Sequence, residues 1–309
     1  MKAYFLQSAA DGMKLELREV PAPQPAAHQL LVKIHASSLN RGEFLGGLGA
    51  AKPGGQEAAG EVVGTGDKVM GRCPGGFAEY GLMEKSDAIP VPPGLSWEQA
   101  GVIPLAFMVV HDMLVAQGNL KAGEWLLVTG ISSGVGVAAL QAAKAIGARV
   151  IGTSGSPEKL KKLQAMGLDV AVHTRKPDFH KQVMEATGGR GVDLVVNNVG
   201  GTVFAECIRS LAYQGRLATV GYLDRVMKAE LDLDALHAKR LRLFGVSNKH
   251  RTAEQRAQTV RGFIADFLPH FAAGRIRPLI DRVYPFDRLP EAQAYMQSDA
   301  HLGKVAVRM

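Results

Sequence analysis

Cysteine is scarce in this chain of 309 residues, which contains only Cys73 and Cys207. Two cysteines cannot form a four-cysteine zinc site and provide no disulfide framework, so we expect two reduced thiols. Long apolar runs are also missing. The longest, residues 105–110, stops at His111 and is far shorter than a membrane-spanning helix. The first residues lack the apolar stretch and cleavage site of a signal peptide, and we therefore expect a cytoplasmic protein.

A long run of one charge sign is absent as well. The formal net charge is +7 and the pI is about 9.4, a balance that suits nucleic acid or an acidic membrane. However, the basic residues are scattered, with only short clusters at 159–162 and 239–242. We expect neither nucleic acid nor a membrane as a partner, because a solvated surface and a phosphate-bearing cofactor account for the charge.

What the chain does contain is a glycine-rich stretch, VTGISSGVG, over residues 128–136. A short apolar run at 125–128 precedes it, and small and apolar residues at helical spacing follow at 137–146. Strand, glycine-rich turn and helix together hold a dinucleotide pyrophosphate, because glycine lets the backbone approach the phosphates and the helix N-terminus presents free N–H groups. The residues expected to bind the dinucleotide here are Gly130, Ser132, Ser133, Gly134, Val135 and Gly136.

The periodicity of the first third, residues 1–106, is typical of a small β-barrel. Glycines and prolines supply turns between expected strands at 15–20, 29–36, 57–63 and 76–82. A helix is expected at 95–102, with Ser96 as its cap and Gln99 three residues later. We expect these residues to form the first part of a catalytic domain.

From residue 107 to 247 the pattern alternates between apolar runs and helical spacing, which predicts a doubly wound parallel sheet. Its expected strands are 125–128, 149–153, 170–172, 192–196, 215–220 and 241–246, and its expected helices are 111–117, 135–146, 156–167, 179–187 and 202–212. The last part, 248–309, is expected to return to the first domain through helices 253–272 and 289–297 and strands 279–284 and 304–308.

A set of short motifs occurs in an order that is specific when taken together: 38–43 (SLNRGE), 60–63 (GEVV), 75–80 (GGFAEY), 130–136, 152–154 (GTS), 191–193 (GVD), 215–217 (GRL) and 303–305 (GKV). With them the chain resembles the medium-chain dehydrogenase/reductase superfamily, in its zinc-independent quinone oxidoreductase and enoyl reductase branch. The resemblance covers nearly the whole chain. It implies an α/β fold with a Rossmann doubly wound parallel sheet inserted into a GroES-like β-barrel catalytic domain, and a homodimer through an edge of the cofactor sheet.

The residues at the zinc position of this superfamily argue against a metal. Zinc alcohol dehydrogenases carry a Gly-His-Glu motif where this chain has Gly55-Gln56-Glu57, and a cysteine near the position of Asn40, where this chain has none. A catalytic zinc ion needs three good protein ligands, which cannot be assembled here. We expect no metal.

The second strand of the nucleotide domain predicts which cofactor binds. NAD sites place an acidic residue at the end of this strand to bind the ribose 2′-hydroxyl, but here the strand ends in GTSGS at 152–156. The resemblance assigns the 2′-phosphate of NADPH to Ser154 and Lys159, and more loosely to Arg175. A hydroxyl and cations suit a phosphate, and we expect NADPH. The alternative, that Lys159 and Arg175 are only solvated charges, stays open.

Without a metal, the easier chemistry is hydride transfer to a quinone or an α,β-unsaturated carbonyl compound, in which charge moves onto a carbonyl oxygen. The resemblance points to Asn40 as a pocket residue whose amide donates to that oxygen, although Asn40 can equally be a turn former. Tyr80 is a second catalytic candidate, as a proton donor, with a structural role as its alternative. The remaining cofactor residues are expected at the carboxyl ends of later strands: Asn198, Val199, Gly221 and Asn248.

Three other functions compete with this interpretation. A short-chain dehydrogenase is disfavoured, because no tyrosine in the chain is followed four residues later by lysine and the glycine-rich stretch begins near residue 130. An NADPH-binding structural or regulatory protein with little turnover stays open, since a fold does not fix a function. An alcohol dehydrogenase is the second alternative. Phe107 and Val109 stand where the family usually has smaller or more polar residues, which leaves the substrate undetermined.

Overall fold

The computed structural model describes residues 1–9, 12–44 and 51–309. The chain divides into two compact units, and each is described by itself. Unit 1 combines Met1–Met108 with Thr252–Met309, and unit 2 is the continuous segment Val109–Arg251. The divisions fall within four residues of the sequence-based boundaries, which were 106/107 and 247/248.

Unit 2 is built on a parallel sheet of six strands, in the order β11-β10-β9-β12-β13-β14. Its strands are β9 (Trp125–Thr129), β10 (Arg149–Ser154), β11 (Val170–His173), β12 (Val192–Asn197), β13 (Leu211–Thr219) and β14 (Arg242–Gly245). The central strands β9 and β12 are mostly apolar and almost entirely buried, because helices cover both faces. The strand order reverses between β9 and β12, and in this fold ligands bind outside the carboxyl ends at that reversal.

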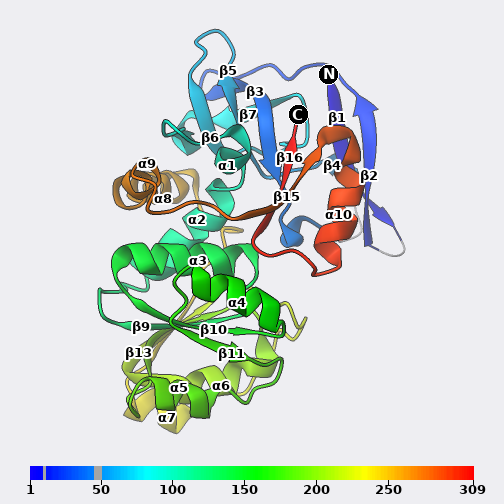
Figure 1. Ribbon diagram of the computed structural model, residues 1–309. Helices are drawn as coiled ribbons and strands as arrows, with labels where there is room; N and C mark the ends of the chain where they lie inside the picture. The colour runs from blue at the N-terminus through cyan, green and yellow to red at the C-terminus, as the bar shows by residue number, and fades with distance from the viewer. Residues whose placement is uncertain (10–11, 45–50) are drawn as a thin grey trace. The chain divides into compact units, whose positions relative to one another are not determined.

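The helices of unit 2 lie on both faces of its sheet (Figure 1). One face carries α3 and α4, and the other carries α5, α6 and α7 (Figure 1). Their bounds are α3 (Gly134–Ile146), α4 (Pro157–Ala165), α5 (His180–Ala186), α6 (Phe204–Ser210) and α7 (Leu233–Ala238), with a short turn η4 (Gly201–Val203) before α6. Ser133 caps α3, and Ser156 caps α4, which has a proline in its first turn.

Unit 1 contains a seven-stranded sheet and a smaller three-stranded one. In the larger sheet the order is β15-β16-β3-β5-β6-β8, with β7 paired to β3, and in the smaller it is β2-β1-β4. Its strands are β1 (Lys2–Ala9), β2 (Gly12–Glu19), β3 (Gln29–Ser38), β4 (Lys52–Pro53), β5 (Glu57–Val62), β6 (Lys68–Arg72), β7 (Tyr80–Glu84), β8 (Ala88–Pro90), β15 (Ile280–Pro285) and β16 (Lys304–Arg308). The last strand, β16, pairs with β3, which places the end of the chain against its first third.

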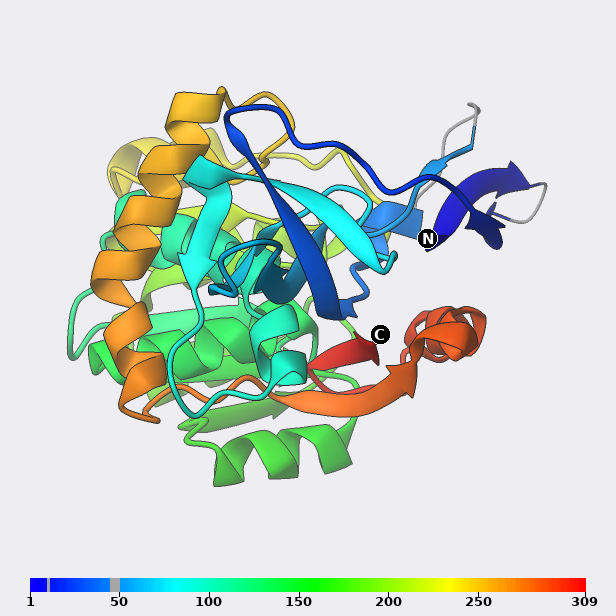
Figure 2. The ribbon, with the colours of Figure 1, turned by 90° about the horizontal axis from the view of Figure 1, so that it is seen from above.

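Five α-helices and several short helical turns belong to the described part of unit 1 or to its boundary: α1 (Trp97–Gly101), α2 (Pro104–His111), α8 (Ala253–Asp266), α9 (Leu268–Ala272), α10 (Leu289–Gln297), η1 (Arg41–Phe44), η2 (Lys85–Asp87) and η5 (Phe286–Arg288). Helix α10 lies beside the β1–β2 hairpin (Figure 2). Its buried residues form one apolar cluster with Tyr4 and Leu6 of β1. The capping box expected at Ser96 and Gln99 is present at α1.

Several local expectations were wrong, each for a physical reason. The strand expected at 76–82 begins only at Tyr80, because Gly76 lies in a turn and donates its N–H to Cys73 O. The helix expected at 253–272 is divided at Phe267, because Pro269 has no N–H to continue the helix. The helix expected at 202–212 ends at Ser210.

The remaining differences concern elements that the sequence patterns did not indicate. The helix expected at 111–117 is instead the end of α2 followed by a π-helical turn, η3 (Asp112–Ala116). Strands β1, β4, β6 and β8 and helix α7 were not predicted, because each is short or lacks clear alternation. The expected fold class is confirmed: an α/β chain whose parallel Rossmann-type sheet interrupts a β-rich domain. Among the described residues, no helix is both long enough and apolar enough to cross a membrane.

Candidate functional site

The glycine-rich turn of unit 2 joins β9 to α3, at the carboxyl edge of the sheet. Gly130 has a φ of 62°, in the left-handed region that glycine enters without steric cost. Its N–H donates to the Thr153 hydroxyl at 3.2 Å, which ties the turn to the end of β10. A Cβ on Gly136 would lie 2.6 Å from the Ile131 carbonyl oxygen, so the third glycine is needed for this close approach.

The first turn of α3 presents backbone donors at this edge. The Ser133 hydroxyl accepts a hydrogen bond from Gly136 N at 3.1 Å and so satisfies one of the four free N–H groups of the helix. Gly134 and Val135 contribute two further first-turn N–H groups. Because no helical carbonyl lies four positions before them, these N–H groups have no acceptor within the helix. A helix N-terminus of this kind, entered through a glycine turn, fits a pyrophosphate group.

The end of β10 carries the hydroxyls expected for the adenosine side of a dinucleotide. Ser154 is buried, and its Oγ lies 3.3 Å from Ser132 Oγ in the glycine turn. The Ser154 Oγ also accepts from Ser156 N at 3.3 Å, at the cap of α4. Lys159 stands in the first turn of that helix, where its N–H donates to the Ser156 hydroxyl. These residues, separated by up to 27 positions, meet at one edge of the sheet.

Arg175 joins this group through its contact with a glycine. A Cβ on Gly155 would collide with the Nε and Cγ atoms of Arg175, so the arginine side chain packs directly on the Gly155 backbone. The guanidinium therefore lies at Gly155, the residue that follows Ser154. No carboxylate is present between residues 152 and 157, and the first one, Glu158, bonds to the Ser156 hydroxyl at 2.9 Å. This hydroxyl and cation set fits a 2′-phosphate better than a bare ribose hydroxyl.

Of the residues expected on the later strands, Asn198 and Val199 lie next to the glycine turn. The side-chain amide of Asn198 donates to Thr129 O at 3.0 Å, and its backbone N–H donates to Thr129 Oγ1 at 3.1 Å. Val199 follows it, and a Cβ on Gly130 would lie 3.5 Å from the Val199 Cγ2 atom. Gly221 follows β13, and its N–H donates to Asn197 O at 3.4 Å.

Asn248 lies beyond β14, at the outer edge of the same sheet, where its carbonyl accepts from Arg251 N at 3.3 Å. The structure thus brings the residues of β9, β10, β12 and β13 together, with Asn248 more distant by strand order. The sequence analysis missed Leu223, whose Cδ1 would lie 3.3 Å from a Cβ on Gly130. No local pattern could identify it, because it stands in the segment after β13 that folds back on Asn198.

Unit 1 contains a buried polar cluster centred on Glu57, the first residue of β5. Glu57 has no exposed surface, and its Oε1 accepts hydrogen bonds from the Ser38 hydroxyl, from Asn40 Nδ2 at 2.9 Å and from Lys304 Nζ at 3.0 Å. The second oxygen, Oε2, accepts from Leu105 N at 2.8 Å. A buried carboxylate is tolerated only when it is paired and hydrogen-bonded in this way.

Asn40 is held inside this cluster with every polar atom of its side chain paired. One amide hydrogen is donated to Glu57 and the other to Glu43 Oε1, each at 2.9 Å, and Oδ1 accepts from Lys304 Nζ at 2.7 Å. Donation from Asn40 to a substrate oxygen therefore requires the release of one of these bonds. The proposed role of Asn40 stays a prediction, now with this condition attached.

Glu43 is a second carboxyl group that accepts a hydrogen bond from Asn40. Burial raises the pKa of the Glu43 carboxyl from 4.5 to about 8, against the lowering effect of the Asn40 hydrogen bond. The Glu57 carboxylate raises this pKa further, while the Lys304 ammonium lowers it. Glu43 Oε2 is inaccessible to solvent and has no hydrogen-bond partner in the described part of the chain.

The sequence analysis quoted Glu43, Glu57 and Lys304 within motifs but assigned them no role. A partial signal was available in β5, whose residues other than Glu57 and Glu61 are small or apolar: a glutamate that is buried in such a strand must find a cation or hydrogen-bond donors. Tyr80, by contrast, is not part of this cluster. It lies opposite Lys33 in β3, about 17 Å along the strand from Ser38 at a rise of roughly 3.3 Å per residue. Its role as a proton donor stays a prediction.

At the position of the zinc motif, Gln56 is partly buried. Its backbone carbonyl oxygen accepts a hydrogen bond from Cys73 N at 2.8 Å. Among the residues that the structure describes, no group of three or more histidine, cysteine, aspartate and glutamate side chains could hold a metal ion. Phe107, another departure from the family pattern, is buried in unit 1 with its ring 4.9 Å from that of Phe271.

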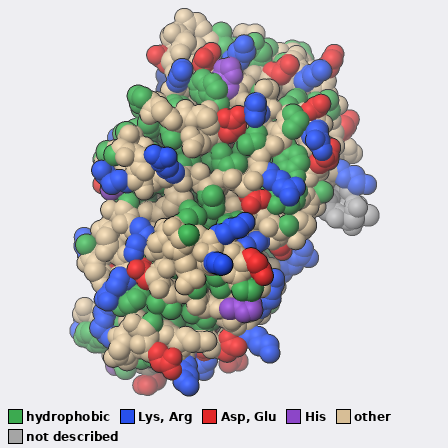
Figure 3. Space-filling model, in the orientation of Figure 1, with side chains coloured by type: hydrophobic (Ala, Val, Ile, Leu, Met, Phe, Trp, Pro, Cys, Tyr) green, Lys and Arg blue, Asp and Glu red, His purple; other side chains and the backbone are tan. Residues whose placement is uncertain are grey.

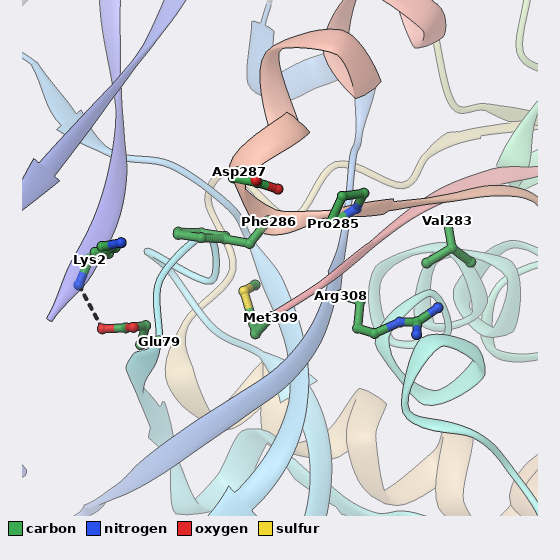
Figure 4. A pocket seen from close by; sticks show the side chains of 8 residues that line it. All are labelled: Lys2, Glu79, Val283, Pro285, Phe286, Asp287, Arg308 and Met309. Carbon is green, nitrogen blue, oxygen red and sulfur yellow. Dashed lines mark hydrogen bonds between the residues drawn. The ribbon is translucent and has the colours of Figure 1, made fainter.

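A surface hollow of unit 1 lies apart from the Glu57 cluster. Figure 4 shows the residues that line it, among them Lys2, whose backbone N–H donates to Glu79 Oε2 at 2.7 Å. The hollow shares no residue with the cluster or the glycine turn, and its two acids and two cations show no preference for one charge sign. On the face shown in Figure 3, basic and acidic side chains are likewise interspersed.

Comparison with known proteins places these features in context. The family described as zinc-binding dehydrogenase matches residues 134–264. The chain is 29% identical to a phenolphthiocerol/phthiocerol polyketide synthase of Mycobacterium tuberculosis over 95% of its own length, but it spans only 14% of that synthase. It is 27% identical to human quinone oxidoreductase, over 90% of this chain and 88% of that protein.

Solved structures of quinone oxidoreductases resemble this chain along its whole length. The quinone oxidoreductase of Thermus thermophilus, determined alone and with NADPH, superposes with a TM-score of 0.86 and 28% identity. The superposition covers 100% of this chain and 100% of that one. The correspondence therefore includes the β-rich unit as well as the nucleotide-binding one.

Proposed function

Because the chain belongs to the medium-chain dehydrogenase/reductase superfamily, we propose that it is an NADPH-dependent oxidoreductase that transfers a hydride to a quinone or an α,β-unsaturated carbonyl compound. The general part of this proposal, an oxidoreductase that uses NADPH, rests on the residues at the carboxyl edge of the unit 2 sheet. The finer part, the acceptor, rests on the chemistry of the Glu57 cluster and on the relatives named quinone oxidoreductase.

The observation that carries the choice of NADPH is the end of β10. Ser132 and Ser154 place two hydroxyls 3.3 Å apart, Arg175 packs on Gly155, and no carboxylate stands where an NAD site places one. A 2′-phosphate would meet a hydroxyl and a cation there rather than a repelling charge. The first-turn N–H groups of α3 would hold the pyrophosphate.

When bound, NADPH supplies the hydride. The chain's own residues would orient it: the glycine turn would hold the pyrophosphate, and Asn198, Val199 and Gly221 would face the nicotinamide side. The Asn40 amide, once it releases Glu43 or Glu57, would stabilise negative charge that develops on the carbonyl oxygen of the acceptor. Conjugated acceptors suit this arrangement, since they delocalise charge onto oxygen without a metal.

An acceptor panel tests the proposal. The purified protein is given NADPH or NADH with 9,10-phenanthrenequinone, a 2-alkenal and an enoyl thioester, and cofactor oxidation is followed by absorbance. We expect turnover with NADPH and at least one acceptor, and a clear preference over NADH. Tight NADPH binding without turnover across the panel would instead support the structural or regulatory alternative.

The 2′-phosphate assignment has its own test in helix α4. We expect Lys159→Ala to raise the KM for NADPH by about 10-fold or more, as the loss of one charge-assisted contact costs about 1.5–3 kcal/mol. NADH kinetics should not change. The matched control is Lys162→Ala, in the same helix but exposed. An unchanged NADPH affinity in Lys159→Ala contradicts the assignment.

A second candidate function, alcohol dehydrogenase, is favoured by the description of the matching family as zinc-binding. Elemental analysis of the purified protein, with activity measured before and after a chelator, distinguishes the two. A stoichiometric zinc ion and loss of activity on chelation would establish the alcohol dehydrogenase.

The assembly and location of the protein are also proposals. Strand β14 forms one edge of the unit 2 sheet, and we propose a homodimer through a sheet edge of that unit. Light scattering coupled to gel filtration gives the mass directly, and a 32.9 kDa species at micromolar concentration contradicts the dimer. The cytoplasmic location is tested by fractionation of the source cells.

A further inference from the structure

The segment that follows β13, residues 220–231, folds back along the carboxyl edge of the unit 2 sheet. Asp224 N donates to Val199 O at 2.9 Å, and farther along Val226 O accepts from Gly201 N at 2.9 Å. The backbone of this segment is therefore bound to the loop after β12, which contains two of the expected cofactor residues.

The Asp224 side chain joins the same two segments. Its Oδ2 accepts hydrogen bonds from the Thr202 N–H at 2.8 Å and from the Thr202 hydroxyl at 2.6 Å, and its Oδ1 accepts from Val226 N at 2.8 Å. A Cβ on Gly200 would collide with Oδ1, so the carboxylate occupies space that only a glycine leaves open. Burial raises the pKa of Asp224, but the hydrogen bonds from Thr202 and Val226 outweigh burial and hold this pKa below its usual value. Asp224 is thus a carboxylate at neutral pH, with both oxygens directed at these backbone groups.

Leu223, the residue before Asp224, lies on the glycine turn. Its Cδ1 is the atom nearest to the Cβ position of Gly130, at 3.3 Å, and atoms of Val199 and Asn198 are the next nearest. Leu223 is nevertheless 44% exposed, so a ligand can reach it. An apolar side chain that solvent still contacts gains free energy when a ligand covers it.

The strand order decides what a bound dinucleotide must cross. Strand β9, which leads into Gly130, lies between β10 and β12 in the sheet. A dinucleotide that is held by the hydroxyls at the end of β10 and by the residues after β12 therefore crosses the turn after β9. Leu223 lies at this crossing, with apolar surface that the dinucleotide can cover.

We infer that Leu223 is a further contact of the dinucleotide cofactor and that Asp224 is its positioning residue, because the Asp224 carboxylate holds the segment that places Leu223 on the glycine turn. This inference rests on the proposed function for the identity of the ligand, a nicotinamide dinucleotide, but it requires no turnover. The crossing carries the pyrophosphate, which NADPH and NADH share, and not the 2′-phosphate that distinguishes them. Leu223 and Asp224 therefore contribute equally to the binding of both.

The test measures the Kd of NADPH and of NADH by titration calorimetry, on the purified protein and without an acceptor. For Asp224→Ala we expect both Kd values to rise by about 10-fold or more and by the same factor, because the charge-assisted hydrogen bonds that hold the segment are lost. Leu223→Ala should raise both by about 5-fold, as expected when about half of a leucine side chain is no longer covered.

Asp232→Ala is the matched control. Asp232 is an aspartate after the same strand, and its side chain accepts from Ala235 N at 2.9 Å as the cap of α7. Its replacement removes a similar hydrogen bond to the backbone, but not one at the glycine turn. We expect both Kd values to stay within about twofold of those of the wild type, within the usual scatter of a distant substitution.

A double variant shows whether Asp224 acts through Leu223. In an Asp224→Ala background, Leu223→Ala should raise the Kd values by less than about twofold, because the leucine has already been displaced. Asp224→Asn keeps one oxygen acceptor and should recover part of the affinity. Fully multiplicative effects in the double variant would show that Asp224 does not position Leu223, and would overturn that part of the inference.

The remaining outcomes separate the inference from folding and from the proposed function. Unchanged Kd values in Leu223→Ala, or a change for NADPH alone, overturn the inference. This variant decides the matter even where Asp224→Ala fails to fold, since Leu223 is half-exposed. A wild type that binds NADPH but turns over no acceptor overturns the proposed reaction and leaves the inference standing. A wild type that binds neither dinucleotide overturns both.

Discussion

The ion pair between Glu57 and Lys304 gives the sharpest stability prediction. Glu57 has no exposed surface, the Lys304 side chain is 9% exposed, and their charged atoms lie 3.0 Å apart. Lys304→Met removes the cation and leaves a carboxylate that cannot reach water. Removal of one partner of a buried pair costs about 3–5 kcal/mol. We expect the lower part of this range, because Ser38, Asn40 and the Leu105 N–H still donate to Glu57.

The assay uses the two tryptophans of the chain, one in each unit. Trp97 of unit 1 stacks on His35, with ring centroids 4.6 Å apart, and Trp125 of unit 2 is buried in the sheet. In a Trp125→Phe background, fluorescence during urea unfolding reports unit 1 alone. In a Trp97→Phe background the fluorescence reports unit 2. The urea concentration at the midpoint of that transition should not change when Lys304→Met is added.

A double-mutant cycle separates the pair from its surroundings. In a Glu57→Gln background, which lacks the negative charge, Lys304→Met should lower the free energy of unfolding by markedly less than in the wild type. We expect a coupling free energy of about 2–3 kcal/mol between the two substitutions. A loss below about 1 kcal/mol in Lys304→Met, or strictly additive effects in the cycle, would refute the argument that a buried charge is left without its partner.

Two further predictions concern the glycine contact in unit 2 and the thiols. Gly155→Ala should displace Arg175 and raise the KM for NADPH by about 10- to 100-fold without affecting NADH, whereas Gly245→Ala, which meets no atom within 4 Å, should leave both unchanged. Equal effects of the two substitutions on NADPH would contradict the role of Arg175. Burial raises the pKa of Cys73 to about 12 and also raises that of Cys207, so Ellman's reagent should label neither thiol in the native protein and both after unfolding. Rapid labelling of the native protein would show that one of them is exposed.

Local features could be predicted from the sequence because residues that are close in the chain create them. The turn at Gly130 and the capping box of Ser96 and Gln99 each depend on a few consecutive positions, and each is present in the structure. The parallel sheet was predictable because strands buried on both faces are apolar throughout. Helix ends and short edge strands were less certain, since tertiary contacts rather than periodicity decide them.

The sequence alone also determined the glycine turn, the missing carboxylate after Thr153 and the order of motifs that marks the superfamily. Only the tertiary structure revealed the Glu57 cluster, because Glu57 and Lys304 are 247 positions apart and no local pattern pairs them. The pairing follows from β16 returning to β3 and placing an ammonium beside a buried carboxylate. The same contacts decide that Asn40 is fully hydrogen-bonded and that Glu43 keeps its proton, since burial and neighbouring charges, rather than residue type, set protonation.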